Sequence, residues 1–324
     1  MYKIPQILSC VLLVLSLLRG FGQQTPLSTL IYKDKYRINP AYAGLEGTLF
    51  ASGIYRNQWQ NFEGNPQTMD ISFNCPLYRF GSGMGITFGQ DKLGIQKNHY
   101  VKPSINKVWK SSTWLVSIGL QSEFYWFSLN SNAVRTPQGE YQGGNLDHKD
   151  NQISNLNGSI NIMDLGLSCF VQRGPFELGI AIEKLLESKK DQMVFPWQNN
   201  RTVKGFMGAQ FDWFSINFIE QIVVLSDFKQ SQIDFFSGFE YNGNIFGGVH
   251  VRGYNGNSFE SLGVSFGFSL SKQLKMAYGH EFYMGSIPQQ LNGGSQELGI
   301  FYNFGRAFGL GKAPKIIHSP RYSD

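Results

Sequence analysis

Histidine is the side chain best suited to acid–base and metal chemistry near neutral pH. The chain has five of them: His99, His148, His250, His280 and His318. No two have the spacing of a metal-binding pair. His280 and Glu281 are adjacent on a predicted strand, where neighbouring side chains point to opposite faces, so they cannot form a catalytic pair with each other. The histidines therefore predict neither a metal centre nor an acid–base site.

Two other stretches look like chemical sites only superficially. Residues 147–150 (DHKD) form a charged cluster in a long predicted loop, which could recruit a cation, although loop charges near a membrane surface are usually solvated. Residues 81–85 (GSGMG) look like a nucleotide-binding loop, but a predicted strand follows them where such a loop needs a helix. The sequence has no P-loop and no glycine-flanked serine at a strand-to-helix turn. We therefore expect no catalytic residue, no cofactor and no metal, in a protein that is not an enzyme.

The first 22 residues have the character of a secretory signal peptide. Lys3 gives a short basic start, residues 7–18 are largely apolar, and small residues precede a plausible cleavage site before Gln23. The apolar run is shorter than the roughly 20 residues of a transmembrane helix. Cys10 offers an alternative, lipid attachment, but most of the apolar run follows this cysteine, whereas a lipidated cysteine closes such a run. We expect an exported protein.

The composition narrows the class of protein further. The formal net charge is +5 and falls by two with the signal peptide, which is too mild to indicate a nucleic-acid partner. Charged residues make up 16% of the chain, against about 25% in typical soluble domains. Aromatic residues reach 15%, and there are 37 glycines. Cys75 and Cys169 could pair in an oxidising compartment or be two small strand side chains.

Alternation of apolar with small or polar residues is the main structural signal. In residues 261–270 five apolar side chains alternate with serine and glycine, and residues 176–183 and 114–126 repeat the pattern. Because successive strand side chains point to opposite faces, each segment has one apolar face. Most segments are about 10 residues long, which is what a tilted strand needs to cross a bilayer. The fourteen predicted strands are 48–59, 66–75, 82–91, 97–108, 112–127, 158–171, 175–184, 202–212, 214–224, 231–241, 244–253, 258–269, 272–283 and 295–304.

The lengths of the connections give an independent indication. Residues 128–157, 185–201 and 284–294 are the longest connections, and all three follow odd-numbered strands, whereas connections after even-numbered strands are short. Outer-membrane barrels have short periplasmic turns and longer external loops. With the N-terminus in the periplasm, every long loop lies outside. The sequence therefore predicts an all-β, transmembrane outer-membrane antiparallel β-barrel of about 14 strands.

The predicted strands place charged residues on the face opposite the apolar one, toward the barrel lumen. These residues could line water or pair across an occluded interior, and the sequence leaves open whether the lumen is open or plugged. The predicted lumen residues are Asp70, Glu123, Glu177, Glu183, Asp234, Glu240, Lys275 and Glu281.

The chain divides into four predicted parts: a signal peptide (1–22), a periplasmic N-terminal segment (23–47), a transmembrane β-barrel (48–304) and a basic periplasmic C-terminal tail (305–324). Residues 182–191 alone have a helix-like pattern. The tail carries Arg306, Lys312, Lys315 and Arg321 against one acid, Asp324. It is either a solvated extension or a partner-binding segment.

Five motifs resemble the PorP/SprF family, which consists of outer-membrane proteins of the type IX secretion system in Bacteroidetes. The motifs are residues 38–44 (INPAYAG), 55–59 (YRNQW), 62–68 (FEGNPQT), 85–94 (GITFGQDKLG) and 294–304 (GSQELGIFYNF). The resemblance spans residues 24–304, although the middle matches by pattern more than by motif. In one respect the chain departs from common barrels, because twenty residues follow the aromatic Phe304 that would end the last strand.

The motif residues also allow physical interpretations. Asn39-Pro40 favours a rigid extended turn, and Tyr42 lies beside small residues that permit close approach to the barrel wall or to a periplasmic neighbour. Tyr55 and Trp59 suit an interfacial aromatic girdle, and Arg56 could reach headgroups or a loop carboxylate. A purely structural role remains an equal alternative for each. The candidate partner-binding residues are Asn39, Pro40, Tyr42, Arg56, Trp59, Lys312, Lys315 and Arg321.

The resemblance implies a non-enzymatic secretion component that supports the export or surface attachment of secreted proteins, or of gliding adhesins in motile species. Its expected partners are outer-membrane lipid, periplasmic motor or ring components, and a secreted surface protein or adhesin. The alternative from a different class is a diffusion channel or uptake barrel for small solutes. We expect a cell outer membrane location in either case.

Overall fold

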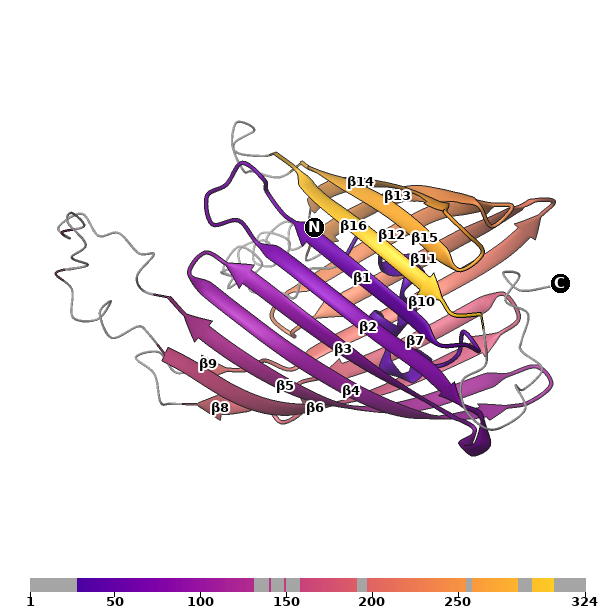
Figure 1. The fold of residues 1–324 in the computed structure, drawn as a ribbon, viewed down its shortest axis with the longest axis horizontal. Coiled ribbons are helices and arrows are strands. Elements are labelled where there is room, and N and C mark those ends of the chain that lie inside the picture. Colours follow the sequence, from indigo (N-terminus) through magenta and orange to yellow (C-terminus); the bar gives the residue numbers. More distant parts are fainter. Residues whose placement is uncertain are drawn as a thin grey trace, which may run out of the picture.

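The computed structural model describes residues 28–130, 140, 149, 158–190, 197–254, 258–284 and 293–305. They form a closed antiparallel β-barrel of fourteen strands (Figure 1). Each predicted strand is present, with ends that differ by at most three residues, so the predicted fold is confirmed. The barrel strands are β1 (Phe50–Asn57), β2 (Gln67–Leu77), β3 (Ser82–Leu93), β4 (Gln96–Lys110), β5 (Leu115–Leu129), β6 (Gly158–Arg173), β7 (Phe176–Glu183), β10 (Thr202–Trp213), β11 (Ile216–Ser226), β12 (Ser231–Tyr241), β13 (Ile245–Tyr254), β14 (Ser258–Ser269), β15 (Leu274–Tyr283) and β16 (Ser295–Asn303).

The strands are joined in the simplest order. Each pairs with its neighbours along the chain, and β1 pairs with β16 to close the barrel. In the closing pair Phe50 lies opposite Asn303, and Asn57 lies opposite Gln296. A slip of one residue would turn every apolar outward side chain into the lumen, so the alternation itself fixes this register.

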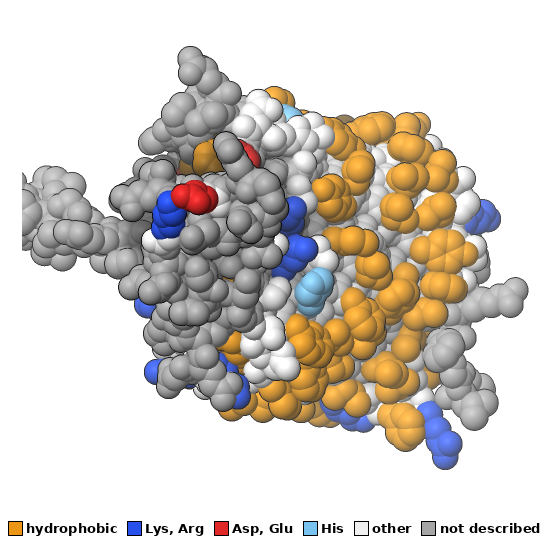
Figure 2. All heavy atoms as spheres, turned by 60° about the vertical axis from the view of Figure 1, so that its left-hand side comes forward, with side chains coloured by type: hydrophobic (Ala, Val, Ile, Leu, Met, Phe, Trp, Pro, Cys, Tyr) orange, Lys and Arg blue, Asp and Glu red, His pale blue; other side chains and the backbone are white. Residues whose placement is uncertain are grey.

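The outer wall is apolar. Outward side chains such as Ile118, Leu120 and Phe266 are about half exposed, as suits a surface that faces lipid. Figure 2 shows a wide band of hydrophobic side chains on the face in view, with lysine and arginine at its margins. The same strands turn serine, glycine and charged residues inward.

The connections divide the barrel into two ends. Turns such as Gln172–Pro175 and Tyr241–Ile245 are tight at the end that we call the short-turn end. The predicted long loops leave the opposite, long-loop end. The loop after β7 contains a two-stranded ladder of β8 (Lys189–Lys190) and β9 (Trp197–Gln198). The helix-like pattern of residues 182–191 is therefore misleading, because Ile182 belongs to β7 and its backbone pairs with β10.

The N-terminal segment lies inside the barrel. Its helical turns η1 (Ile31–Lys33), α2 (Lys35–Ile38) and η2 (Pro40–Tyr42) follow one another across the lumen, and we call residues 28–47 the plug (Figure 1). This corrects the expectation of a periplasmic segment for the described part of residues 23–47. A single turn, η3 (Tyr78–Phe80), lies between β2 and β3. No helix among the described residues is long and apolar enough to span a membrane.

The predicted signal peptide lies outside the described residues. So do the tail beyond Gly305 and, with it, the candidates Lys312, Lys315 and Arg321.

Candidate functional site: the plugged lumen

Inward glycines of the wall make room for the plug. A Cβ atom on Gly83 would lie 2.0 Å from the carbonyl oxygen of Ala43, and one on Gly119 would lie 2.8 Å from the amide nitrogen of Ala41. A Cβ on Gly85 would meet the Tyr36 ring at 2.5 Å. Gly83 and Gly85 are therefore part of the wall behind the plug, where the first allows close packing against the plug backbone and the second makes room for the Tyr36 ring.

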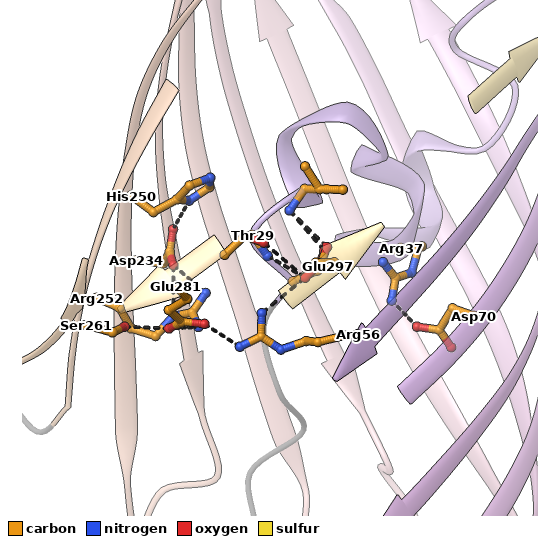
Figure 3. A network of polar contacts seen from close by, with 12 residues as sticks. Thr29, Arg37, Arg56, Asp70, Asp234, His250, Arg252, Ser261, Glu281 and Glu297 are labelled. Atoms are coloured by element: carbon orange, nitrogen blue, oxygen red, sulfur yellow. Dashed lines mark hydrogen bonds and ion pairs between the residues drawn. The ribbon is translucent and has the colours of Figure 1, made fainter. Parts of the chain in front are cut away.

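The plug begins at a buried carboxylate near the long-loop end. Glu297 of β16 accepts hydrogen bonds from the amide nitrogens of Thr29 (2.9 Å) and Leu30 (3.1 Å), and from the hydroxyl of Thr29 (3.1 Å) (Figure 3). Ser28 donates to the same carboxylate, and Arg56 of β1 lies 3.1 Å from it. Glu297 is only 1% exposed. Two backbone donors of the plug and one guanidinium thus depend on this acid.

A chain of alternating charges continues around the wall from Arg56. Arg56 also pairs with Glu281, which lies 2.6 Å from Arg252, and Arg252 pairs in turn with Asp234 at 2.8 Å (Figure 3). His250 lies 3.2 Å from the same aspartate. This network ties β1, β12, β13 and β15 together inside the barrel. Arg56 is 3% exposed, so the expectation that it reaches headgroups or a loop carboxylate is wrong.

The three basic side chains of the plug each pair with an acid on the wall. Lys33 lies 2.6 Å from Glu240, Lys35 pairs with Glu177, and Arg37 pairs with Asp70. These pairs fit the rule that buried charges need an opposite charge and hydrogen bonds. The plug is basic where the wall is acidic, so the two surfaces are electrostatically complementary.

Asp34, the only acidic residue between residues 28 and 45 of the plug, is held by hydroxyl groups. Asp34 accepts hydrogen bonds from Ser52 and Ser72, the latter at 2.9 Å. Burial raises the pKa of Asp34, and the nearby Arg37 opposes this shift. Burial likewise raises the pKa of Tyr36 to about 12, and its hydroxyl lies 2.8 Å from that of Ser104.

The motif at residues 38–44 holds the last turn of the plug against the wall. The Asn39 side chain accepts from the amide of Ala41 (2.9 Å) and donates to the carbonyl of Cys169 (2.8 Å). Pro40 occupies the first position of η2, where its missing N–H costs nothing. From the wall, Asn106 donates to the carbonyls of Ala41 (2.7 Å) and Ala43 (2.8 Å). The motif is thus a short cap and turn that fixes plug to barrel.

Apolar contacts complete the seat of the plug. Tyr32 stacks on Phe236 with ring centroids 4.0 Å apart. Ile31 and Ile38 join Phe170 and Phe206 in one buried cluster. Tyr42 packs edge-on against Phe170 at 5.2 Å. The plug therefore combines a small apolar core with ion pairs around it.

A polar cavity of about 60 Å³ remains between the plug and the wall. Its lining carries charges of both signs, including Arg37, Asp70, Asp91, Lys102, Glu183 and Lys204. Within the part of the chain that the structure describes, no group of three or more histidine, cysteine, aspartate or glutamate side chains is arranged to hold a metal ion.

The sequence predicted the acidic residues of the lumen wall but not the basic plug that they bind. The lumen position is confirmed for all eight predicted charged residues. The residues predicted from the sequence do not include Glu297, Arg252 or the plug cations Lys33, Lys35 and Arg37. An excess of acids on the inward face, with inward glycines beside them, was the available signal for a basic segment inside the barrel.

The candidate partner-binding residues separate into two groups. Asn39, Pro40 and Arg56 are buried in the contact between plug and wall, where Tyr42 is partly buried as well. Trp59 lies just beyond β1 at the long-loop end with a positive φ of 49°, and its ring meets Tyr283 edge-on at 6.4 Å. The structure therefore does not bring the five candidates among the described residues together into one external surface.

A closed antiparallel barrel with an apolar outer belt and a polar, filled interior defines an outer-membrane β-barrel protein. Within that class, the family model described as type IX secretion system membrane protein PorP/SprF matches residues 20–302. The chain belongs to this family, and it is a membrane component of type IX secretion located in the outer membrane.

Comparisons with other proteins add nothing about function. No curated protein matches the sequence. Among solved structures, the Acinetobacter baumannii outer membrane protein Omp33 is similar at 5% identity with a TM-score of 0.44, over 79% of this chain and 96% of its own. The TodX deltaS2S3 mutant monoaromatic hydrocarbon channel is similar at 10% identity with a TM-score of 0.47, over 86% and 95%. The KdgM porin is similar at 10% identity with a TM-score of 0.37, over 79% and 99%. Likenesses this low carry no argument about this chain.

Two family motifs meet inside the barrel, and a third contacts the wall at a different place. Arg56 of the motif at residues 55–59 pairs with Glu297 of the motif at residues 294–304. The motif at residues 38–44 lies against Gly83 and Gly119 of the wall. These residues are far apart in sequence, and their shared role is to seat the plug.

Proposed function

We propose that this protein is a non-enzymatic outer-membrane component of the type IX secretion system that supports the export or surface attachment of secreted proteins or gliding adhesins. The observation that carries the proposal is the plug, which crosses the lumen and is bound to the wall by buried ion pairs. A barrel filled in this way serves as a fixed membrane scaffold and not as a pore for small solutes. The family membership supports the same role.

The contacts indicate that the plug stays in place. Withdrawing it would separate the plug cations from Glu240, Glu177 and Asp70 and strip Glu297 of two backbone donors. Breaking one buried pair costs about 3–5 kcal/mol when one charge remains buried. Opening the barrel therefore requires a partner that supplies replacement contacts.

The proposed partners bind outside the lumen. Asn39, Pro40, Tyr42 and Arg56 already serve the contact between plug and wall. This leaves Trp59, at the long-loop end, as a candidate for cargo. The tail residues Lys312, Lys315 and Arg321 are the candidates for periplasmic motor or ring components.

A deletion strain tests the secretion role. Loss of the protein should stop the surface display of a specific exported protein, and the wild-type gene supplied in trans should restore it. Surface proteomics of intact cells measures the effect. Unchanged export and display of all surface proteins in the deletion strain would reject the role.

A small-solute channel is the second candidate. The polar cavity between plug and wall, with charges of both signs, is the observation in its favour. Stable conductance of the purified protein in a planar bilayer would support this candidate, and silence would count against it.

A further inference from the structure

One acidic side chain lies on the lipid-facing wall. The alternation of β11 turns Ile219, Gln221 and Val223 into the lumen, and each of the three is at most 3% exposed. Glu220 has the opposite phase, which it shares with Ile222 and with Val224, a side chain 37% exposed on the outer wall. Its carboxylate therefore points to the membrane.

The depth of Glu220 places it within the apolar belt. It lies four residues from the start of β11, which corresponds to roughly 10 Å above the short-turn end for a strand with about 3.3 Å rise per residue and a tilt near 40°. Below it, Trp213 and Tyr241 are exposed where an aromatic girdle marks the headgroup level. Ionisable side chains within the membrane are rare and mark functional sites.

The neighbours of Glu220 form a small polar notch. Ser237 of β12 lies directly opposite Glu220 and donates a hydrogen bond to it at 2.9 Å. Ala209 lies opposite on β10. Large outward side chains of β10 and β12 flank Glu220 on both sides along the strands. Met207 and Phe235 lie toward the long-loop end, and Phe211 and Phe239 lie toward the short-turn end. A side chain from outside can therefore reach the carboxylate between two rows of large apolar residues.

We propose that Glu220 is the anchor of a contact with a different membrane-embedded protein, which presents a lysine or arginine to this notch. A cation at this depth supplies the charge that the carboxylate needs in a surrounding of low dielectric constant. Amines of lipid headgroups lie at the level of the girdle, further toward the short-turn end. A symmetric contact with a second copy through this same face does not fit, because the described outward residues of β10 to β13 above the girdle carry no cation to pair with Glu220.

Site-specific photocrosslinking in intact outer membranes tests this contact. A photoreactive phenylalanine derivative replaces Ile222, beside the notch, or Phe88 on the far wall as the control. Position 222 should crosslink to one membrane protein, and the crosslinked peptide should come from a membrane-spanning segment with a lysine or arginine. Position 88 should give no such product.

Charge variants of Glu220 then decide whether the carboxylate anchors the contact. Glu220→Lys should lower the yield of the crosslink from position 222 at least tenfold, and Glu220→Gln should lower it by less. Reversing the partner's cation to glutamate should restore the yield with Glu220→Lys. Altered migration of unheated samples in SDS gels confirms folding, and if Glu220→Lys does not fold, Glu220→Gln and Glu220→Leu provide the comparison.

Three results would overturn the proposal: crosslinks to lipid only, crosslinks to a second copy of this chain, or yields that do not depend on the charge at position 220. The contact lies on the outer wall and is read without any export assay. The crosslink from position 222 therefore tests the contact at Glu220 separately from the secretion role. If the secretion role fails its own test, the contact at Glu220 can still be present.

Discussion

Replacing Glu297 should release the beginning of the plug while the barrel stays folded. This buried carboxylate accepts from the amides of Thr29 and Leu30 and from the hydroxyl of Thr29, and it lies 3.1 Å from Arg56. Glu297→Ala removes the acceptor altogether. Glu297→Gln keeps one oxygen but loses the charge, and Arg56 retains Glu281 in both variants.

The size of the effect follows from the number of lost bonds. A hydrogen bond to a charged group contributes about 1.5–3 kcal/mol, so the loss of two backbone donors in Glu297→Ala costs about 3–6 kcal/mol. Glu297→Gln should cost about 2 kcal/mol, since an oxygen remains to accept one donor. Because about 1.4 kcal/mol corresponds to a factor of ten, amide protection in the plug should fall at least 100-fold for Glu297→Ala.

Hydrogen exchange of the protein in lipid bilayers measures this directly. Protection of the amides of residues 29–34 should fall, while protection of strands β4 to β6 should not change. Gln296→Ala, at the adjacent outward position, is the matched control and should leave the plug amides protected. Protection within twofold of wild type in Glu297→Ala, or an equal loss across the whole barrel, would refute the reasoning.

Three further predictions concern the seat of the plug. Gly83→Val should displace the plug, because even a Cβ atom there would lie 2.0 Å from the Ala43 carbonyl oxygen. Limited proteolysis should then cut within residues 28–47. The control is Gly205→Val, where a Cβ atom meets nothing within 4 Å, and it should leave residues 28–47 resistant. Lys35→Met and Glu177→Gln should each lower the free energy of unfolding by about 3–5 kcal/mol, because each leaves one buried charge without its partner. The double variant Lys35→Met/Glu177→Leu removes both charges and should be nearly neutral. Urea unfolding in bilayers measures these free energies, and additive losses in the double variant would contradict the ion pair. Burial raises the pKa of Asp34, so the folded state binds this proton more tightly than the unfolded state. Wild type should therefore gain stability relative to Asp34→Asn as the pH falls from the raised pKa toward the ordinary carboxyl value of 3.8, and urea unfolding at a series of pH values measures the gain. A constant difference in unfolding free energy from pH 7 down to about pH 4 would contradict a raised pKa.

The barrel wall was predictable because one physical rule governs it. Each strand must turn an apolar face to lipid and the other face to the lumen, so residues such as Phe266 and Ser265 reveal their positions by alternation alone. The same rule fixes the register between strands. Connection length distinguishes the two ends of the barrel.

The plug was not predictable from alternation because its residues face the barrel wall on several sides. Residues 33–37 (KDKYR) are polar and would suit an exposed segment equally well. What buries them is the position of Glu240, Glu177 and Asp70 in the folded barrel, which brings together strands far apart in sequence. Arg56 was misplaced for the same reason, since its two carboxylate partners lie on β15 and β16.

Conductance in a planar bilayer tests most directly whether residues 28–47 fill the lumen. The purified wild-type protein should be silent, and a variant that lacks residues 28–47 but folds, as its migration in unheated SDS gels shows, should give stable open channels. Wild-type channels as large as those of the shortened variant would contradict a plugged barrel.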